Sequence, residues 1–445
     1  MIATFFTSLC FSGCKKWEDH TAATDAMVGK DIFQQIKENS DLSKFAELLT
    51  KSGYDKIISS SQTYTVFAPA NSALASIDPA VVANDAKLKL FVGNHITNQL
   101  QPAATNGVVR LQMLNGKYNN LQAKMLEQAI ITTSDKYGKN GILHIIDKMV
   151  PALNNAWEFL QSDPLMPANQ KTFLLAQTDS ANTNLFLRNV LNLRDEQKQF
   201  TFFVLVDTAF TSEVNKYKQY FVTGSPDSTT KLATTAVVND FAVEGVYAPA
   251  SIPDTILSKF NTKVGIDKST IVQTVKVSNG IVYIMSKLAV LPRHKFQQYI
   301  IQGENYSFSR ADRRNNTYFR DKFNPVTATD FRDVLVFGHG LAQFYLGYRL
   351  QNVPSLKFKA YWVALHDNIN SNAATFRQLL GIGTPLSTSL PYTTVAVNNY
   401  NEVYLGEFTM ATYSPFLNVH LTADNSTNND ANKITVDYIR LEPVL

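Results

Sequence analysis

The chain has 445 residues, of which 45% are hydrophobic and 18% are charged, and its formal net charge is +4 at pH 7. This composition is typical of folded globular proteins and argues against long disorder, and so weak a positive charge argues against nucleic-acid binding. At about 100–200 residues per domain, the length predicts two to four domains.

Both cysteines of the chain, Cys10 and Cys14, lie at its start. Residues 1–13 form an apolar run that ends in small residues, and charged residues begin directly after Cys14. Although it has no basic residue before the apolar run, this segment resembles a bacterial lipoprotein signal with Phe11-Ser12-Gly13-Cys14 as the lipobox. The resemblance implies that 1–13 are removed, that Cys14 is acylated and inserts into outer-membrane lipid, and that 14–29 form a tether.

Two stretches of the chain are repeated. Residues 65–74 (TVFAPANSAL) align with 201–210 (TFFVLVDTAF), and 140–148 (NGILHIIDK) align with 279–287 (NGIVYIMSK). The two matches occur in the same order at nearly the same spacing, which predicts a duplicated domain.

The first copy begins with a predicted amphipathic helix. Its apolar residues share one helical face, Ser40 or Asp41 is expected to cap its start, and Gly53 is suited to its end. The apolar residues are Leu42, Phe45, Leu48 and Leu49.

Strand and turn signals follow this helix. Residues 63–67 are β-branched and aromatic, and they predict a strand that ends before Pro69. We expect Asn71 to cap a helix that begins at residue 73, and Asn140-Gly141 to form a tight turn before the second strand of a hairpin at 142–146. The fold of each copy is therefore predicted to be mixed α+β.

The two repeated boxes resemble the signature boxes of the fasciclin domain. We assign a first fasciclin domain to 30–152 and a divergent second one to 153–292, in which Tyr283 replaces the box histidine, His144. The resemblance implies an adhesion or extracellular interaction module. The family's adhesive tyrosine–histidine pair is incomplete here, since the histidine remains only as His95. We expect His95 and His144 to be hydrogen-bonded structural residues.

Residues 293–445 have a different pattern. Short strand-like runs follow one another without helices, which predicts an all-β sandwich. The final segment 432–443 resembles the last strand of galactose-binding-like jelly rolls, a group that includes many carbohydrate-binding modules. The predicted fold class is therefore two α+β fasciclin domains followed by an all-β jelly-roll sandwich.

A sugar-binding third domain requires exposed aromatic rings beside fixed polar groups. The candidates are Trp362, Tyr361, Tyr392 and Tyr404, with Asn398, Asn399, Asn401 and Asn418 as hydroxyl partners. The alternative is that these rings fill the sandwich core. Because neighbouring strand residues point to opposite faces, one of Tyr361 and Trp362 is expected to leave the core.

The sequence gives weaker signals for a metal and for catalysis. Asp424, Asn428 and Asp430 offer oxygen ligands for calcium, but a polar turn explains them equally well, so we predict no cofactor. No nucleophile elbow, zinc helix or phosphate loop is present. Paired carboxylates for glycoside hydrolysis stay open, with Asp330, Asp333, Asp367 and Glu402 as candidates whose spacing does not select them.

The leading hypothesis is a non-catalytic lipoprotein on the surface of the outer membrane. It would hold an extracellular polysaccharide as an accessory to a glycan-uptake complex. The alternative is a structural or adhesive subunit that binds other envelope proteins through its fasciclin domains and binds no sugar. A glycan-degrading enzyme is the third reading.

Overall fold

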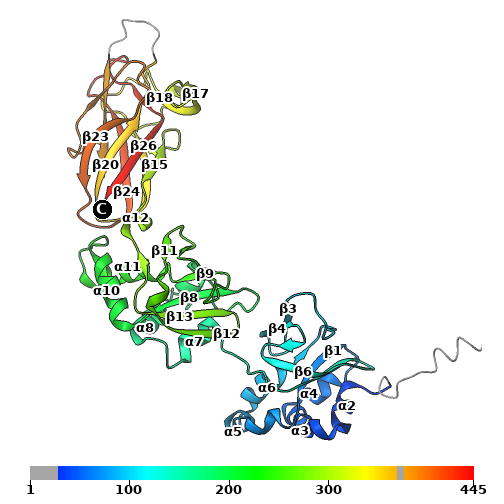
Figure 1. Cartoon of the computed structure of the whole chain (residues 1–445). Coiled ribbons are helices and arrows are strands. Elements are labelled where there is room, and N and C mark those ends of the chain that lie inside the picture. The colour runs from blue at the N-terminus through cyan, green and yellow to red at the C-terminus, as the bar shows by residue number, and fades with distance from the viewer. Residues whose placement is uncertain (1–28, 368–374) are drawn as a thin grey trace, which may run out of the picture.

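The computed structural model describes residues 29–367 and 375–445; Cys14 and the predicted leader lie outside them. The described residues form two mixed α/β domains followed by an all-β domain, arranged in series along an extended molecule (Figure 1). This is the fold class that the sequence predicts. In the described part of the chain, no helix has both the length and the apolar character that a membrane-spanning segment needs.

The first domain is built on a seven-stranded sheet in the order β2-β1-β7-β6-β5-β4-β3, with helices packed beside it. Only β1 and β7 run parallel, and every other neighbouring pair is antiparallel. The elements are α2 (Ile32–Glu38), α3 (Ser43–Ser52), α4 (Tyr54–Ile58), β1 (Tyr64–Pro69), α5 (Pro79–Val82), α6 (Asp85–Gly93), β2 (Ile96–Thr97), β3 (Val109–Gln112), β4 (Tyr118–Gln122), β5 (Met125–Leu126), β6 (Ala129–Gly138) and β7 (Gly141–Ile146).

The predicted first helix is α3, and its apolar face is buried as expected. Gly53 ends it in the left-handed conformation at φ 79°. The predicted cap is wrong, because residues 40–42 form a 3₁₀ turn that is capped by Asn39. Asn71 was expected to cap its own helix, but its side-chain oxygen instead accepts a hydrogen bond from Lys44 N, at 3.0 Å, in the first turn of α3. The asparagine therefore joins two segments that are distant in sequence.

The second domain repeats the central arrangement of the first. Its sheet β12-β13-β8-β9 corresponds to β6-β7-β1-β2, and β8 runs parallel to β13 as β1 does to β7. Its elements are α7 (Ala156–Ser162), α8 (Ala168–Ala176), α9 (Leu185–Asn189), β8 (Phe200–Leu205), α10 (Asp207–Lys218), α11 (Pro226–Val238), β9 (Ala242–Glu244), β10 (Thr255–Leu257), β11 (Lys263–Gly265), β12 (Ile271–Val277), β13 (Gly280–Met285) and β14 (Ala289–Val290).

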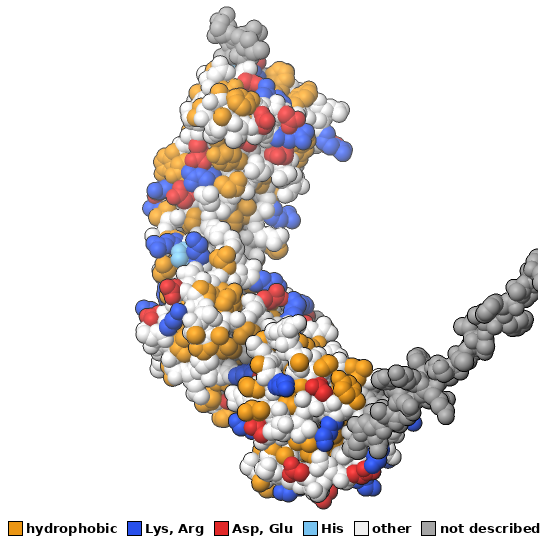
Figure 2. Space-filling model, turned by 45° about the vertical axis from the view of Figure 1, so that its right-hand side comes forward, with side chains coloured by type: hydrophobic (Ala, Val, Ile, Leu, Met, Phe, Trp, Pro, Cys, Tyr) orange, Lys and Arg blue, Asp and Glu red, His pale blue; other side chains and the backbone are white. Residues whose placement is uncertain are grey.

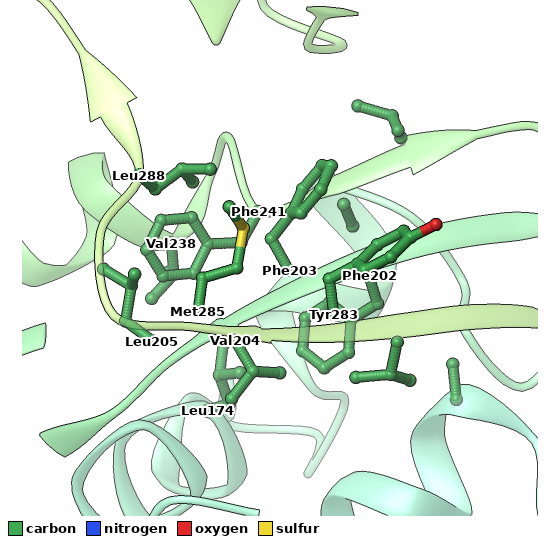
Figure 3. Packing of buried hydrophobic residues seen from close by; sticks show 14 of the residues in the cluster. Leu174, Phe202, Phe203, Val204, Leu205, Val238, Phe241, Tyr283, Met285 and Leu288 are labelled. Carbon is green, nitrogen blue, oxygen red and sulfur yellow. The ribbon is translucent and has the colours of Figure 1, made fainter. Parts of the chain in front are cut away.

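The core of the second domain lies on both faces of β8. Phe203 points to one face and stacks on Tyr283, with ring centroids 6.0 Å apart. Val204 points to the other face, toward Leu174 of helix α8 (Figure 3). A strand that is covered on both sides reads as a continuous apolar run, which explains the sequence FTFFVL of β8.

The third domain is an antiparallel sandwich around one core. Its sheets are β15-β26-β20-β23, β16-β19-β24-β21-β22 and β17-β18-β25. The elements are α12 (Pro292–Lys295), β15 (Tyr299–Gln302), β16 (Phe308–Ser309), β17 (Thr317–Asn324), β18 (Thr329–Val336), β19 (Tyr345–Val353), β20 (Lys357–Val363), β21 (Phe376–Ile382), β22 (Thr393–Val395), β23 (Val403–Thr409), β24 (Ser414–Ala423), β25 (Ile434–Val436) and β26 (Tyr438–Val444).

Candidate ligand-binding face of the third domain

The outer face of the sheet β15-β26-β20-β23 carries a row of side chains that crosses all four strands. The strand register places Ile300 opposite Arg440, Arg440 opposite Tyr361, and Tyr361 opposite Tyr404. Neighbouring strands lie about 4.8 Å apart, so the row extends over roughly 14 Å. We call these four residues the transverse row.

Two tyrosines and an arginine form the centre of the row. The rings of Tyr361 and Tyr404 lie 5.3 Å apart at 51° to each other. The Arg440 guanidinium carbon lies 4.0 Å from the centre of the Tyr361 ring, which covers one face of that ring. Tyr404 is 52% exposed and therefore presents the freest aromatic surface of the row.

The guanidinium of Arg440 is fixed by carboxylates. Its Nε and Nη2 donate to the two oxygens of Glu402 at 2.7 and 2.6 Å, and its Nη1 donates to Glu442 at 2.7 Å. The hydrogen bonds from Arg440 lower the pKa of Glu402, which is therefore ionised at neutral pH. A two-pronged pair of this kind holds the guanidinium plane in a defined orientation against Tyr361.

The four predicted aromatic residues do not lie at one site in the structure. Tyr361 and Tyr404 come together as described, and Tyr361 leaves the core while Trp362 enters it, as the alternation predicts. The inclusion of Trp362 among the exposed candidates is wrong, because the indole is 1% exposed and belongs to the sandwich core. Tyr392 precedes β22 in the other sheet, where it lies beside Arg377 and donates to Ala423 O.

The predicted asparagine partners of a sugar also lie in different parts of the third domain. Asn398, Asn399 and Asn401 lie in the segment before β23, the strand that carries Tyr404. Asn418 lies on β24 in the five-stranded sheet. The structure therefore leaves Asn418 on a different sheet from the transverse row.

The calcium candidates have other partners. Asp424 forms an ion pair with Arg377 at 2.9 Å, and Asp430 forms one with Lys433 at 3.2 Å. The Asn428 side chain accepts a hydrogen bond from Asp430 N, as in a polar turn. Within residues 29–367 and 375–445, no three or more His, Cys, Asp or Glu side chains are grouped so that they would hold a metal ion.

Three of the four carboxylates considered for glycoside hydrolysis are ion-paired. Asp333 and Asp367 both contact Arg320, Asp367 also pairs with Lys322, and Glu402 is held by Arg440. Burial opposes the ionisation of Asp367, but Lys322 and Arg320 lower its pKa. Asp333, Asp367 and Glu402 are therefore each held in an ion pair with a basic side chain.

His144 and His95 of the first domain are structural residues, as expected. His95 is fully buried and accepts from Val150 N while its other nitrogen contacts Phe91 O. His144 accepts from Asp135 N and its Nε2 lies 2.9 Å from Gln101 O. In the second domain Tyr283 takes the place of His144 and donates to Tyr247 O at 2.7 Å.

Sequence reasoning missed Arg440 and Ile300 as members of the site. The period-two pattern of Tyr438, Arg440 and Glu442 in the last strand was the available signal, since these residues share one face. Their proximity to Tyr361 depends on β26 pairing with β20, and that pairing is a long-range contact.

Comparison with known proteins finds a family match for the first domain. Residues 40–151 match the family model of the fasciclin domain. The transforming growth factor-beta-induced protein ig-h3 of Sus scrofa is 25% identical over 288 residues, which cover 60% of this chain and 39% of that protein. The chain thus spans about two fifths of the length of this relative.

Solved structures of two kinds are similar to parts of the chain. The FAS1 domain pair of the insect cell adhesion molecule Fasciclin I is 17% identical with a TM-score of 0.24, covering 58% of this chain and 100% of that structure. The CBM36-1 domain of a xylanase from the hindgut metagenome of Trinervitermes trinervoides is 16% identical with a TM-score of 0.24, covering 33% of this chain and 98% of that structure. Residues 40–151 therefore contain a fasciclin domain, and the second domain repeats the central strand arrangement of this first one.

Proposed function

We propose that this protein is a non-catalytic binding protein that holds a polysaccharide on the outer face of its third domain. The observation that carries the proposal is the transverse row, in which Tyr404 and Tyr361 lie side by side on an exposed sheet face. Aromatic rings offer apolar faces on which the C–H faces of sugar rings stack, and the row is long enough for an oligosaccharide.

Fixed polar groups accompany these rings. Glu402 and Glu442 are oriented by Arg440, and Tyr438 donates to Glu402 at 3.3 Å. Carboxylates that are already positioned accept hydrogen bonds from hydroxyl groups without further ordering of their side chains. This combination of ring faces and fixed acceptors supports a neutral, hydroxyl-rich ligand.

The pairing of the carboxylates supports binding without catalysis. Glycoside hydrolysis needs a carboxylic acid whose pKa is raised so that it can donate a proton. Arg440 has the opposite effect on Glu402, the carboxylate that lies beside the aromatic pair. The transverse row is therefore better suited to holding a glycan than to cleaving it.

The cellular setting of this proposal comes from the sequence. Acylation of Cys14 would anchor the chain in the outer membrane, and residues 14–29 would link the anchor to the first fasciclin domain. On the cell surface the third domain would then serve as an accessory to a glycan-uptake complex. Mass spectrometry of the native N-terminus should find acyl-cysteine at Cys14, and an unmodified Met1 would contradict the anchor.

The first test is a glycan array and an affinity gel with the full chain and its Tyr404→Ala variant. We expect the variant to bind a retained polysaccharide about fivefold to tenfold more weakly, since an aromatic contact contributes about 1 kcal/mol. Tyr137→Ala is the matched control, because Tyr137 is 53% exposed in the first domain, far from the row in sequence. Equal loss of binding in both variants would contradict the assignment of the site.

The second candidate is an adhesive subunit that binds envelope proteins through its fasciclin domains. The match of residues 40–151 to the fasciclin family favours it. Absence of binding across a broad panel of polysaccharides, together with a specific complex with an envelope protein, would favour this function over the first. Turnover of a polysaccharide would contradict both.

A further inference from the structure

A cavity of about 510 Å³, open to solvent on one side, lies between the first and second domains. Strand β4 and the segment after β7 supply one wall, and β12 and the start of β13 supply the other. Apolar side chains from both domains line it, among them Met149, Leu153, Val246 and Ile281. Polar and charged side chains make up about half of its lining residues, and its size is that of a small-molecule site.

Named contacts hold the two walls together. Lys117 of the first domain is nine-tenths buried and donates to Glu158 and Glu196 of the second, both at 2.6 Å. Arg110 donates to the backbone carbonyls of Glu196 and Gln197 at 2.5 and 2.7 Å. These contacts fix the two domains against each other and so define the cavity.

The charges around the cavity are unevenly paired. Glu127 is the carboxylate in the lining, and it is already paired with Lys276. Arg110 and Lys148 also line the cavity, and within the described residues neither has a carboxylate within 4.0 Å. Asp195 and Glu196 attract the guanidinium of Arg110 from beyond this distance.

The guanidinium of Arg110 is held in a fixed orientation at the cavity. Its guanidinium lies 4.1 Å above the Tyr118 ring, and the two carbonyl contacts fix its plane. A guanidinium that is oriented in this way loses little freedom when it binds an anion. The lining therefore combines apolar side chains with the pre-positioned guanidinium of Arg110 and the exposed Lys148.

We propose that this interdomain cavity binds an amphiphilic anion, whose apolar body lies between the domains and whose carboxylate or sulfonate contacts Arg110 and Lys148. The site is separate from the transverse row and does not depend on glycan binding. Because its walls come from both domains, a ligand there would also stabilise the arrangement of the fasciclin pair.

The test uses two fluorescent probes and the full chain. 8-Anilinonaphthalene-1-sulfonate carries an aromatic body and a sulfonate, and N-phenyl-1-naphthylamine carries the same body without the charge. We expect saturable fluorescence of the sulfonate probe with the wild-type chain. In Lys148→Gln, its affinity should fall about tenfold, since a hydrogen bond to a charged group is lost. The affinity of the neutral probe should stay the same.

Two further variants make the result specific. Thr274 lies at an exposed strand position that lines the cavity, and Thr274→Trp should obstruct part of the cavity and weaken the binding of both probes. Lys231→Gln is the matched control, because Lys231 is exposed on α11 and takes no part in the lining. The proposal is overturned if the wild type gives no saturable signal, if Thr274→Trp changes neither probe, or if Lys148→Gln weakens both probes equally.

Discussion

His95, one of two buried histidines of the first domain, is held neutral chiefly by its burial. Val150 N donates to its Nε2 at 3.0 Å, a bond that requires an unprotonated nitrogen, while its Nδ1 lies 2.9 Å from Phe91 O. Burial lowers the pKa of His95 to about 4, although the bond to Phe91 opposes this shift. The imidazole therefore links the backbone of Phe91 to that of Val150 inside the core. It is not exposed on the surface, where an adhesive residue would have to lie.

This histidine makes the first domain sensitive to acid. The pKa of an unfolded histidine is about 6.5, so below that pH the unfolded state binds the proton first and stability falls as the pH decreases toward 4. We expect about 2 kcal/mol to be lost between pH 7 and pH 5 from His95 alone. Urea unfolding of the full chain and of His95→Gln at both pH values measures this. Equal pH dependence in the two proteins would contradict the prediction.

At the scale of elements, the two fasciclin-like domains share an asparagine–glycine joint at the start of their parallel strands. Asn140 donates to Ile58 O and accepts from Ile32 N, and Asn279 donates to Leu193 O and accepts from Ala156 N. In both domains the asparagine therefore connects the start of the first helix, a residue before the first parallel strand, and the central sheet. These matching bonds explain why the dipeptide recurs when the surrounding sequence has diverged.

The glycine of this joint is irreplaceable for a steric reason. Gly280 has φ 152°, and a Cβ there would lie 1.9 Å from Phe200 O on the adjacent parallel strand. We expect Gly280→Ala to destabilise the second domain by about 3 kcal/mol or more, as an overpacked and strained site does. Gly224→Ala is the control, because a Cβ there meets nothing within 4 Å. Urea unfolding monitored at the buried Trp157 measures both, and a similar midpoint for the two variants would contradict the prediction.

At the scale of the whole molecule, the second and third domains share an aromatic cluster and a backbone connection. Phe296 packs against both cores and lies 4.7 Å from Tyr220 and 5.9 Å from Phe221. Ser355 N donates to Tyr220 O at 2.9 Å, and Val222 N donates to Ser355 Oγ at the same distance. These contacts make the third domain a fixed extension of the second, which holds the transverse row in a defined orientation.

Removing the shared ring should loosen this connection. In Phe296→Ala we expect the amides of Val222 and Ser355 to exchange with deuterium about tenfold faster, because the packing that supports their hydrogen bonds is lost. Amides of β13 in the second domain should keep their protection. Phe416→Ala, at a position that is 63% exposed, is the control. Unchanged exchange at Ser355 would show that the backbone connection is independent of the ring.

Figure 2 shows how little of this organisation is visible from outside. On the face shown, hydrophobic, basic and acidic side chains are mixed over all three domains, without a large patch of one sign. Composition alone therefore does not locate a site on this surface. The transverse row and the interdomain cavity are recognised only from strand register and from the residues that face each other.

The sequence by itself determined the elements and their repetition. Local patterns predicted the strands of 434–441, the helix around Phe45 and the two repeated boxes. The structure confirms these elements. Local periodicity is set by the side-chain geometry of a helix or strand, so it can be read without knowing the partner elements. The predicted domain limits stay a prediction.

Only the tertiary structure decided which residues meet. In the structure Trp362 is buried and Tyr361 is not. Asn71 bonds to Lys44 at the start of α3, and Arg440, from a strand distant in sequence, packs against Tyr361. A strand has two faces and alternation does not say which one is covered, because that depends on the sheet that packs against it. Contacts between distant segments are fixed by the packing of the whole chain, and a single sequence does not record them.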